Sequence, residues 1–155
     1  MGAIEAGHAP PPERIAHAGL RGGIAAMAMT GMRVLTVELG LVEEPPPQAI
    51  FRQRARGPLR LVPRKRRRAA IELAHWGYGA AGGAIFGALP NRVRNRAWAG
   101  PLYGAAVWAG FEAGLAPLLG LDQAKRKRPV ERAALAADHL LYGFVLSEFR
   151  QRPRE

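Results

Sequence analysis

The chain lacks several features that would assign it quickly to a known class of protein. It contains no cysteine, so it can form neither a disulfide framework nor a thiolate metal site. It also shows no strand-like alternation, no phosphate-binding glycine loop and no internal repeat. No nucleophile pattern of the G-x-S-x-G kind occurs, and we find no other catalytic motif. These absences leave a helical, non-enzymatic protein without a predicted cofactor.

Acidic residues are scarce relative to basic ones. The 155 residues include 23 Lys or Arg against 12 Asp or Glu, which gives a net charge of +11. Such a surface attracts polyanions, either nucleic acid or an anionic lipid leaflet. The mean hydropathy of −0.10 is low for a protein embedded in lipid, because much of the apolar content is alanine.

The basic residues collect between apolar segments instead of being scattered around helix faces. The clearest apolar segment, Leu73–Asn91, has 19 residues without Asp, Glu, Lys or Arg. This length is close to the roughly 20 residues that cross a bilayer as a helix. The pattern predicts an all-α fold, a small multi-pass transmembrane bundle of about four Gly/Ala-rich helices. We expect a lead-in at 1–14, helices at 15–42, 69–89, 97–121 and 130–149, a basic connector at 45–68 and a basic tail at 150–155.

Small residues recur at four-residue spacing within the apolar segments. This spacing places them on one face of a helix, where they allow close approach of a neighbouring backbone. The stripes predicted to pack in this way are Gly79, Gly83 and Gly87 in the second segment and Ala106, Gly110 and Gly114 in the third.

Several short motifs resemble a known family. They are His75-Trp76-Gly77-Tyr78-Gly79, Pro101-Leu102-Tyr103-Gly104 and His139-Leu140-Leu141-Tyr142-Gly143. Together they resemble the YagU-like family of small bacterial inner-membrane proteins, over roughly residues 15–149. The resemblance implies a multi-pass envelope protein. It implies no enzymatic reaction and no cofactor.

Four ionisable residues fall within the predicted apolar helices: His75, Glu112, Asp138 and His139. Ionisable groups inside apolar segments are costly, so they suggest a function. One hypothesis is that the four converge into a polar cluster that relays protons, pairs with a substrate or senses pH. The alternative is that they only form hydrogen bonds between helices. Neither histidine has a partner at HxxxH spacing, and no metal site is predicted. For Arg33 we expect a pair with Glu38 or a position at an interface.

Two basic runs border the apolar segments and are predicted to contact anionic lipid. They comprise Arg64, Lys65, Arg66, Arg67 and Arg68, and Lys125, Arg126, Lys127 and Arg128. The main prediction is therefore a non-enzymatic, multi-pass protein of the bacterial inner membrane. Its expected partners are the lipid bilayer, anionic lipids, and a second copy of the chain or another membrane protein. The alternative is a soluble or peripheral basic protein that binds nucleic acid or anionic lipid, with nucleic acid the less favoured partner because no helix-turn-helix, zinc or stacking-platform signature occurs.

Overall fold

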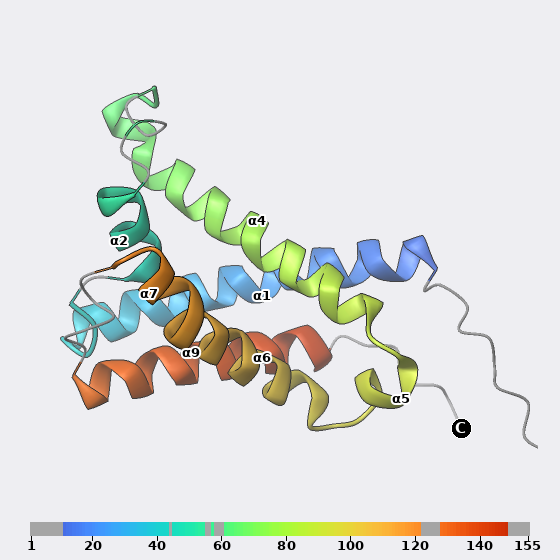
Figure 1. Ribbon diagram of the computed structural model, residues 1–155. Coiled ribbons are helices and arrows are strands. Elements are labelled where there is room, and N and C mark those ends of the chain that lie inside the picture. The colour runs from blue at the N-terminus through green and yellow to red at the C-terminus, as the bar shows by residue number, and fades with distance from the viewer. Residues whose placement is uncertain (1–10, 44, 55–56, 58–60, 122–127, 149–155) are drawn as a thin grey trace, which may run out of the picture.

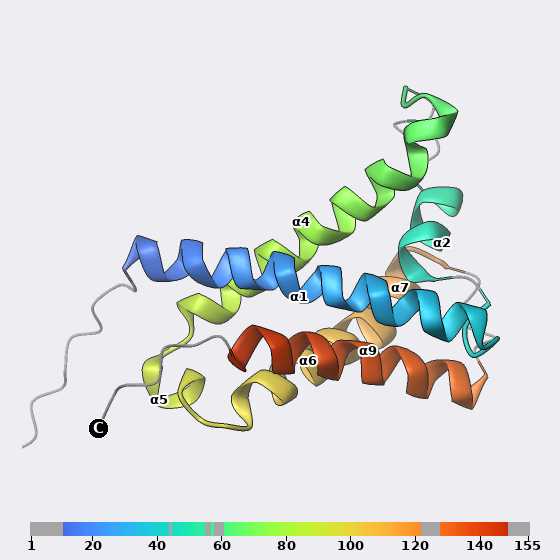
Figure 2. The same ribbon diagram turned by 180° about the vertical axis from the view of Figure 1, so that it is seen from behind.

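The computed structural model describes residues 11–43, 45–54, 57, 61–121 and 128–148. Within these ranges all regular structure is helical, which confirms the all-α prediction. Figures 1 and 2 show the long helices lying across one another in a bundle. In chain order the elements are α1 (Pro12–Glu38), α2 (Pro46–Gln53), η1 (Arg64–Arg66), α4 (Arg67–Ala88), α5 (Asn91–Arg94), α6 (Ala99–Gly110), η2 (Phe111–Leu115), α7 (Ala116–Leu118) and α9 (Pro129–Glu148).

Proline marks where several helices begin. Pro12, Pro46 and Pro129 are the first residues of α1, α2 and α9. Proline suits this position because its fixed φ fits the helix and its missing N–H would have had no partner there. Helix α1 thus begins inside the expected lead-in, and α2 and η1 form within the expected connector 45–68.

Helices α1 and α4 cross with their backbones in contact. A Cβ atom built on Gly22 would lie 2.7 Å from the Cα of Gly83, and the reverse distance is the same. A Cβ on Gly79 would collide with Ala26, and one on Gly87 with Ala18. The small-residue stripe of α4 therefore faces α1, and van der Waals contact between backbones holds this crossing.

A second glycine crossing joins α6 to α9. A Cβ on Gly104 would collide with the carbonyl oxygen of His139, and one on Gly143 with that of Gly100. The expected stripe of the third segment lies elsewhere, since a Cβ on Gly110 or Gly114 meets nothing within 4 Å and Ala106 is exposed. The reason is rotational: position 106 is turned by about 200° from position 104 around an α-helix.

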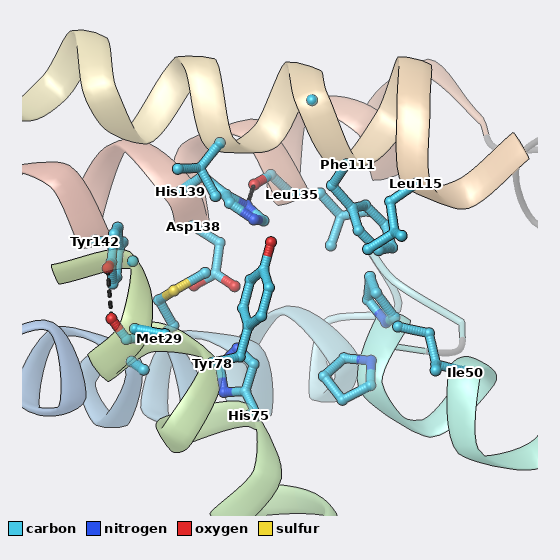
Figure 3. Close-up of a pocket in the computed structure, with 18 of the residues that line it drawn as sticks. Met29, Ile50, His75, Tyr78, Phe111, Leu115, Leu135, Asp138, His139 and Tyr142 are labelled. Atoms are coloured by element: carbon cyan, nitrogen blue, oxygen red, sulfur yellow. Dashed lines mark hydrogen bonds between the residues drawn. The ribbon is translucent and has the colours of Figure 1, made fainter. Parts of the chain in front are cut away.

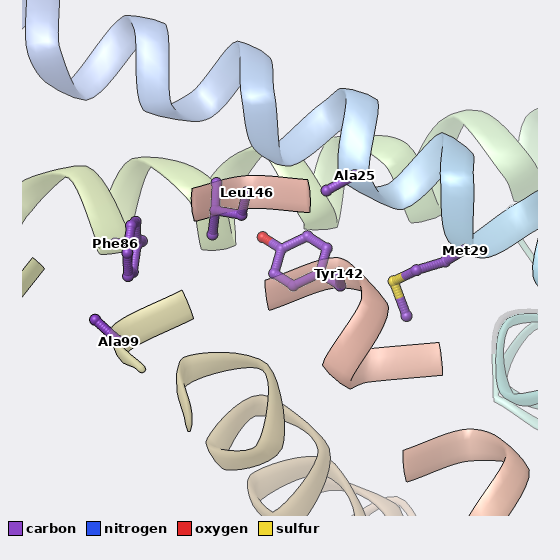
Figure 4. Close-up of a cluster of buried hydrophobic side chains, with 6 residues drawn as sticks. All are labelled: Ala25, Met29, Phe86, Ala99, Tyr142 and Leu146. Atoms are coloured by element: carbon purple, nitrogen blue, oxygen red, sulfur yellow. The ribbon is translucent and has the colours of Figure 1, made fainter. Parts of the chain in front are cut away.

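In its first half, helix α1 buries small side chains and exposes large ones. Ala18, Gly22, Ala25 and Ala26 are buried against the bundle, together with Met29. The exposed face carries Leu20, Ile24, Met27, Val34 and Leu35. In the core, shown in Figure 4, the packed residues are Ala25, Met29, Phe86, Ala99, Tyr142 and Leu146.

Two helix ends share a glycine cap. Gly40 and Gly120 have φ values of 67° and 56°, the left-handed conformation that glycine adopts without a Cβ penalty. At each cap the following residue donates its N–H back into the last helical turn, Leu41 to Thr36 and Leu121 to Ala116. The carbonyl oxygens of the two glycines accept hydrogen bonds from arginines far away in the sequence. Arg128 donates to Gly40 and Arg54 donates to Gly120, both at 3.0 Å.

The helices do not meet the requirements of bilayer spans. None of those in the described part of the chain combines the necessary length with sufficient apolar character. In α4 the uncharged part covers only Leu73–Ala88, of which ten of sixteen residues are Gly or Ala. At 1.5 Å per residue it extends about 24 Å, less than the roughly 30 Å of a hydrocarbon core. This finding contradicts the predicted transmembrane bundle and its multi-pass location in the bacterial inner membrane.

Candidate functional site

A cavity of about 440 Å³ lies where the two helix pairs separate. The glycine contacts hold α1 to α4 and α6 to α9 toward one end of the bundle, which we call the glycine end (Gly22, Gly83, Gly104, Gly143). Beyond these contacts the helices diverge, and α2 covers the opening with Ile50 and Phe51. Figure 3 shows Asp138 and His139 entering the cavity from α9 and His75 and Tyr78 entering from α4. We call this region the cavity end.

The residues that follow α6 form a wider, π-helical turn, which supplies one wall of the cavity. Residues Phe111–Leu115 form the π-helical turn η2, in which the N–H of Ala116 bonds the carbonyl of Phe111. Single π turns inside α-helices are rare and frequently occur at functional sites. Phe111 and Leu115 both line the cavity, facing Ile50 in Figure 3. The turn thus supplies an apolar wall opposite the charged groups of α1 and α4.

A buried ion pair closes the cavity between α1 and α4. Arg33 is 6% exposed, and its Nη1 lies 3.3 and 3.2 Å from the two carboxylate oxygens of Glu72. Glu72 also accepts hydrogen bonds from the Thr30 hydroxyl at 3.1 Å and from Gln48 Nε2 at 3.5 Å. Trp76 Nε1 donates to Thr30 at 3.0 Å. The expected partner of Arg33, Glu38, is exposed at the end of α1, so that expectation was wrong.

Arg33 also covers the ring of His75. Its Nη2 lies 3.2 Å from Nδ1 and 3.1 Å from Nε2. Because the two nitrogens of one imidazole point in different directions, an atom equally close to both lies over the ring face. Burial, then the charge of Arg33, then that of His139 lower the pKa of His75 to about 3. The imidazole is therefore neutral at physiological pH and stacks against the cation.

Asp138 is the one residue of the expected cluster that is almost fully buried. It is 5% exposed, and its Oδ1 has no hydrogen-bond partner. Burial raises the pKa of its carboxyl to about 7, against a smaller lowering by Arg33. A buried acceptor without a partner is uncommon and calls for an explanation, such as a ligand or a catalytic role.

The remaining polar groups near the cavity are bonded to helix backbone. The Nδ1–H of His139 donates to the Leu135 carbonyl at 2.8 Å. The hydroxyls of Tyr103 and Tyr142 donate to the carbonyls of Gly82 and Gly79, both at 2.7 Å. Burial raises the pKa of both phenols, with the neighbouring tyrosines adding to it. These bonds fix the walls, whereas Oδ1 of Asp138, among the residues that line the cavity, accepts no hydrogen bond.

The structure therefore gathers His75, Asp138 and His139 around one cavity. It does not place Glu112 there, since Glu112 points to Arg132, with Oε1 3.6 Å from its Nε. Among the residues that the structure describes, no group of three His, Asp or Glu side chains is positioned to hold a metal ion. Glu72 was not among the predicted site residues, although its place one turn before His75 and Trp76 was a usable signal.

The first basic run is mostly exposed. Arg64, Lys65, Arg66 and Arg68 are exposed, whereas Arg67 is half-buried and donates to the Val62 carbonyl at 3.1 Å. Figure 1 shows the start of α4, which directly follows η1, projecting from the bundle above α2. In the second run only Arg128 lies within the described residues, where it is 3.7 Å from Glu43; outside them lie Lys125, Arg126 and Lys127.

Comparison of the chain with known protein families, with curated proteins and with solved structures gives no match. The resemblance to the YagU-like family therefore stays a prediction.

Proposed function

We propose that the chain is a non-enzymatic helical protein that binds anionic lipid surfaces peripherally. The observation that carries this proposal is the inverted burial of α1. Its outward face carries Leu20, Ile24 and Met27 at helical spacing, while the inward face of the same stretch consists of alanine and glycine, namely Ala18, Gly22, Ala25 and Ala26. A contiguous exposed apolar face marks a contact site for lipid or protein.

The apolar face of α1 has the features of an interfacial helix. The spacing of four and three residues keeps these side chains on one side of the helix. No Asp, Glu, Lys or Arg occurs between Gly22 and Met32. Such a face inserts shallowly at the boundary between headgroups and acyl chains, parallel to the lipid surface. Apolar burial of this kind favours lipid over a partner that offers only phosphates.

The exposed residues of η1 and of the first turn of α4 supply the electrostatic part of binding. Arg64, Lys65, Arg66 and Arg68 are exposed, and Leu61 beside them is 88% exposed. Each basic residue near an anionic leaflet contributes about 1 kcal/mol. Several such residues next to a large apolar side chain match the charge and chemistry of an anionic lipid surface.

Co-sedimentation with vesicles tests the proposal. We expect the full chain to sediment with phosphatidylcholine vesicles that contain phosphatidylglycerol and not with pure phosphatidylcholine. Replacing Leu20, Ile24 and Met27 by glutamine should remove most of this binding, because it deletes the apolar contact. Binding of a DNA duplex, measured at the same salt concentration by fluorescence anisotropy, tests the alternative that the chain binds nucleic acid. Tighter binding to the duplex than to vesicles would overturn the lipid proposal.

The two ends of α4 provide a matched control for position against net charge. Replacing Arg64, Lys65 and Arg66 by glutamine removes three charges in η1, directly before its start. Replacing Arg92, Arg94 and Arg96 removes three charges just beyond its C-terminal end. We expect the first triple variant to weaken vesicle binding at least about tenfold and the second to do so much less. Equal loss in both would mean that only net charge matters and that the start of α4 is no binding site.

A further inference from the structure

We propose that the cavity binds a hydrophobic organic monocation, an amine on an apolar body, with its ammonium group at Asp138. This goes beyond the lipid proposal and rests on different residues. Three features of the cavity favour such a ligand: the unpartnered acceptor, the charge balance and the chemistry of the walls.

Asp138 lacks what an ammonium group would supply. Its Oδ1 is buried, lines the cavity and accepts no hydrogen bond. In Figure 3 its carboxyl points from α9 into the space beside Met29. An N–H donor from a ligand would satisfy this oxygen with a charge-assisted hydrogen bond, the strong form of the interaction. The unsatisfied oxygen thus indicates a ligand that donates.

The charge balance favours a cation over an anion. Arg33 and Glu72 cancel each other, because both carboxylate oxygens of Glu72 lie within 3.3 Å of Arg33 Nη1. His75 is neutral, since its pKa is lowered to about 3. An ionised Asp138 therefore leaves one negative charge in the cavity, which one ammonium neutralises. An anion would add a second negative charge and find Arg33 already engaged.

The walls suit an apolar body next to that ammonium group. They are mostly aliphatic and aromatic, and Figure 3 shows the ring of Tyr78 next to Asp138 and that of Phe111 farther along the cavity. Aromatic faces attract ammonium groups through their quadrupole. A volume of about 440 Å³ falls within the range of small-molecule sites. A phenylalkyl or medium-chain alkyl amine fits this description.

Binding of the amine should release a proton. Burial raises the pKa of Asp138 to about 7, so near pH 6 the free protein holds this carboxyl mainly protonated. The ammonium stabilises the ionised form, so the proton leaves on binding and amine affinity rises with pH up to about 7. The titratable or charged groups that face Asp138 from the surrounding helices are Arg33, Glu72, His75, Tyr78, Tyr103, His139 and Tyr142. Because His139 also lines the cavity, the proton is assigned to Asp138 by its release in the unaltered protein and its absence in Asp138→Asn.

Isothermal titration calorimetry with three probes of one shape tests the proposal. The probes are phenylbutylamine, phenylbutanol and phenylbutyrate, which carry a positive, no and a negative charge. We expect the amine to bind tightest and, near pH 6, to release a proton, detected as a dependence of the heat on the buffer. Asp138→Asn should weaken amine binding at least about tenfold and leave the alcohol unchanged. Tighter binding of phenylbutyrate, an unaltered amine affinity in Asp138→Asn, or no binding of any probe would each overturn the proposal.

A second pair of variants locates the probe without touching the charged groups. Gly110 lines the cavity and a Cβ on it meets nothing within 4 Å, so Gly110→Leu places a side chain at the cavity without a collision at Cβ. Gly114 has the same open surroundings but does not line the cavity, so Gly114→Leu is the matched control. We expect Gly110→Leu to weaken binding of both amine and alcohol and Gly114→Leu to leave both unchanged. Equal affinities in the two variants would place the probe outside the cavity.

Discussion

The glycine end and the cavity end of the bundle use opposite means to hold the same helices. At the glycine end, backbones touch, and the packed groups include Gly22 against Gly83 and Gly104 against the backbone of α9. At the cavity end, the helices stand apart, and an ion pair between Arg33 and Glu72 spans the gap. The first end depends on the absence of side chains and the second on long, charged ones.

The difference between the two ends indicates which of them can bind a ligand. Close backbone packing leaves no space for a ligand, so the glycine end can only hold the helices together. Where the helices diverge, polar groups must be satisfied by one another or by a ligand, because buried groups without partners destabilise the fold. The divergence therefore creates both the cavity and the unpartnered oxygen of Asp138.

The largest expected effect is at the cavity end. Arg33→Met leaves Glu72 as a mostly buried carboxylate without its cation. Breaking one partner of a buried pair destabilises by about 3–5 kcal/mol, and because Glu72 is 14% exposed we expect about 3 kcal/mol. Urea unfolding followed by circular dichroism measures this loss. The double variant Arg33→Met, Glu72→Met should recover most of it, and a double variant as unstable as the single one would contradict this account of the pair.

A smaller effect is expected at the glycine end. Gly22→Ala forces a Cβ against the backbone of α4, 2.7 Å from the Cα of Gly83, and should lower the free energy of unfolding by about 2 kcal/mol. The neighbouring Gly23→Ala is the control, since its Cβ meets only Ala80 at 3.9 Å. It should be stabilising by up to about 1 kcal/mol through helix propensity. Equal stabilities of the two variants in urea unfolding would show that α1 and α4 do not pack as described.

Substitution at the second glycine crossing, between α6 and α9, should lower the stability less. Gly104→Ala brings a Cβ onto the His139 carbonyl, but α6 has only 12 residues and ends in a π turn, so it can shift to relieve the contact. We expect a loss of about 1–2 kcal/mol in the free energy of unfolding. Gly110→Ala, which meets nothing within 4 Å, serves as its control in the same unfolding experiment. A Gly104→Ala variant at least as stable as this control would argue against the α6–α9 contact.

The smallest effect is a change in how stability depends on pH. The pKa of His75 is lowered to about 3, so its contribution to stability is lost as pH falls from about 6.5 toward 3. The pKa of Asp138 is raised to about 7, so its contribution is lost as pH rises from about 4 to 7. The two oppose each other between about pH 4 and 6.5. Asp138→Asn should make stability rise more steeply with pH in this window, by at most about 1.4 kcal/mol per pH unit. Urea unfolding at three pH values checks this, and parallel profiles would refute it.

The helical class and one packing stripe were accessible from the sequence because both follow from local spacing. Gly79, Gly83 and Gly87 recur every four residues, and α4 turns that stripe toward α1. The membrane assignment failed because counting uncharged residues ignores how weakly alanine and glycine favour lipid. The packing face of α6 was misplaced because a Gly/Ala-rich helix offers several such stripes, and Gly100 and Gly104 formed an equally regular one.

The candidate site was accessible only in part. Unusual residue types in apolar helices indicated His75, Asp138 and His139, which the structure places around one cavity. Spacing along the chain could not reveal that Arg33 meets Glu72, since 39 residues separate them and the contact depends on how α1 crosses α4. The cavity itself has no sequence signature, because it arises from the divergence of two helix pairs.

The inverted burial of α1 has a consequence for how this sequence can change over time. In most helices the large inward residues are the ones that tolerate least variation, and the outward ones drift. Here the outward Leu20, Ile24 and Met27 can be exchanged for other apolar residues with little effect on the bundle, whereas the smallest inward residue, Gly22, admits no side chain at all. Among the uncharged residues of α1, selection should therefore fall hardest on the one with the fewest atoms.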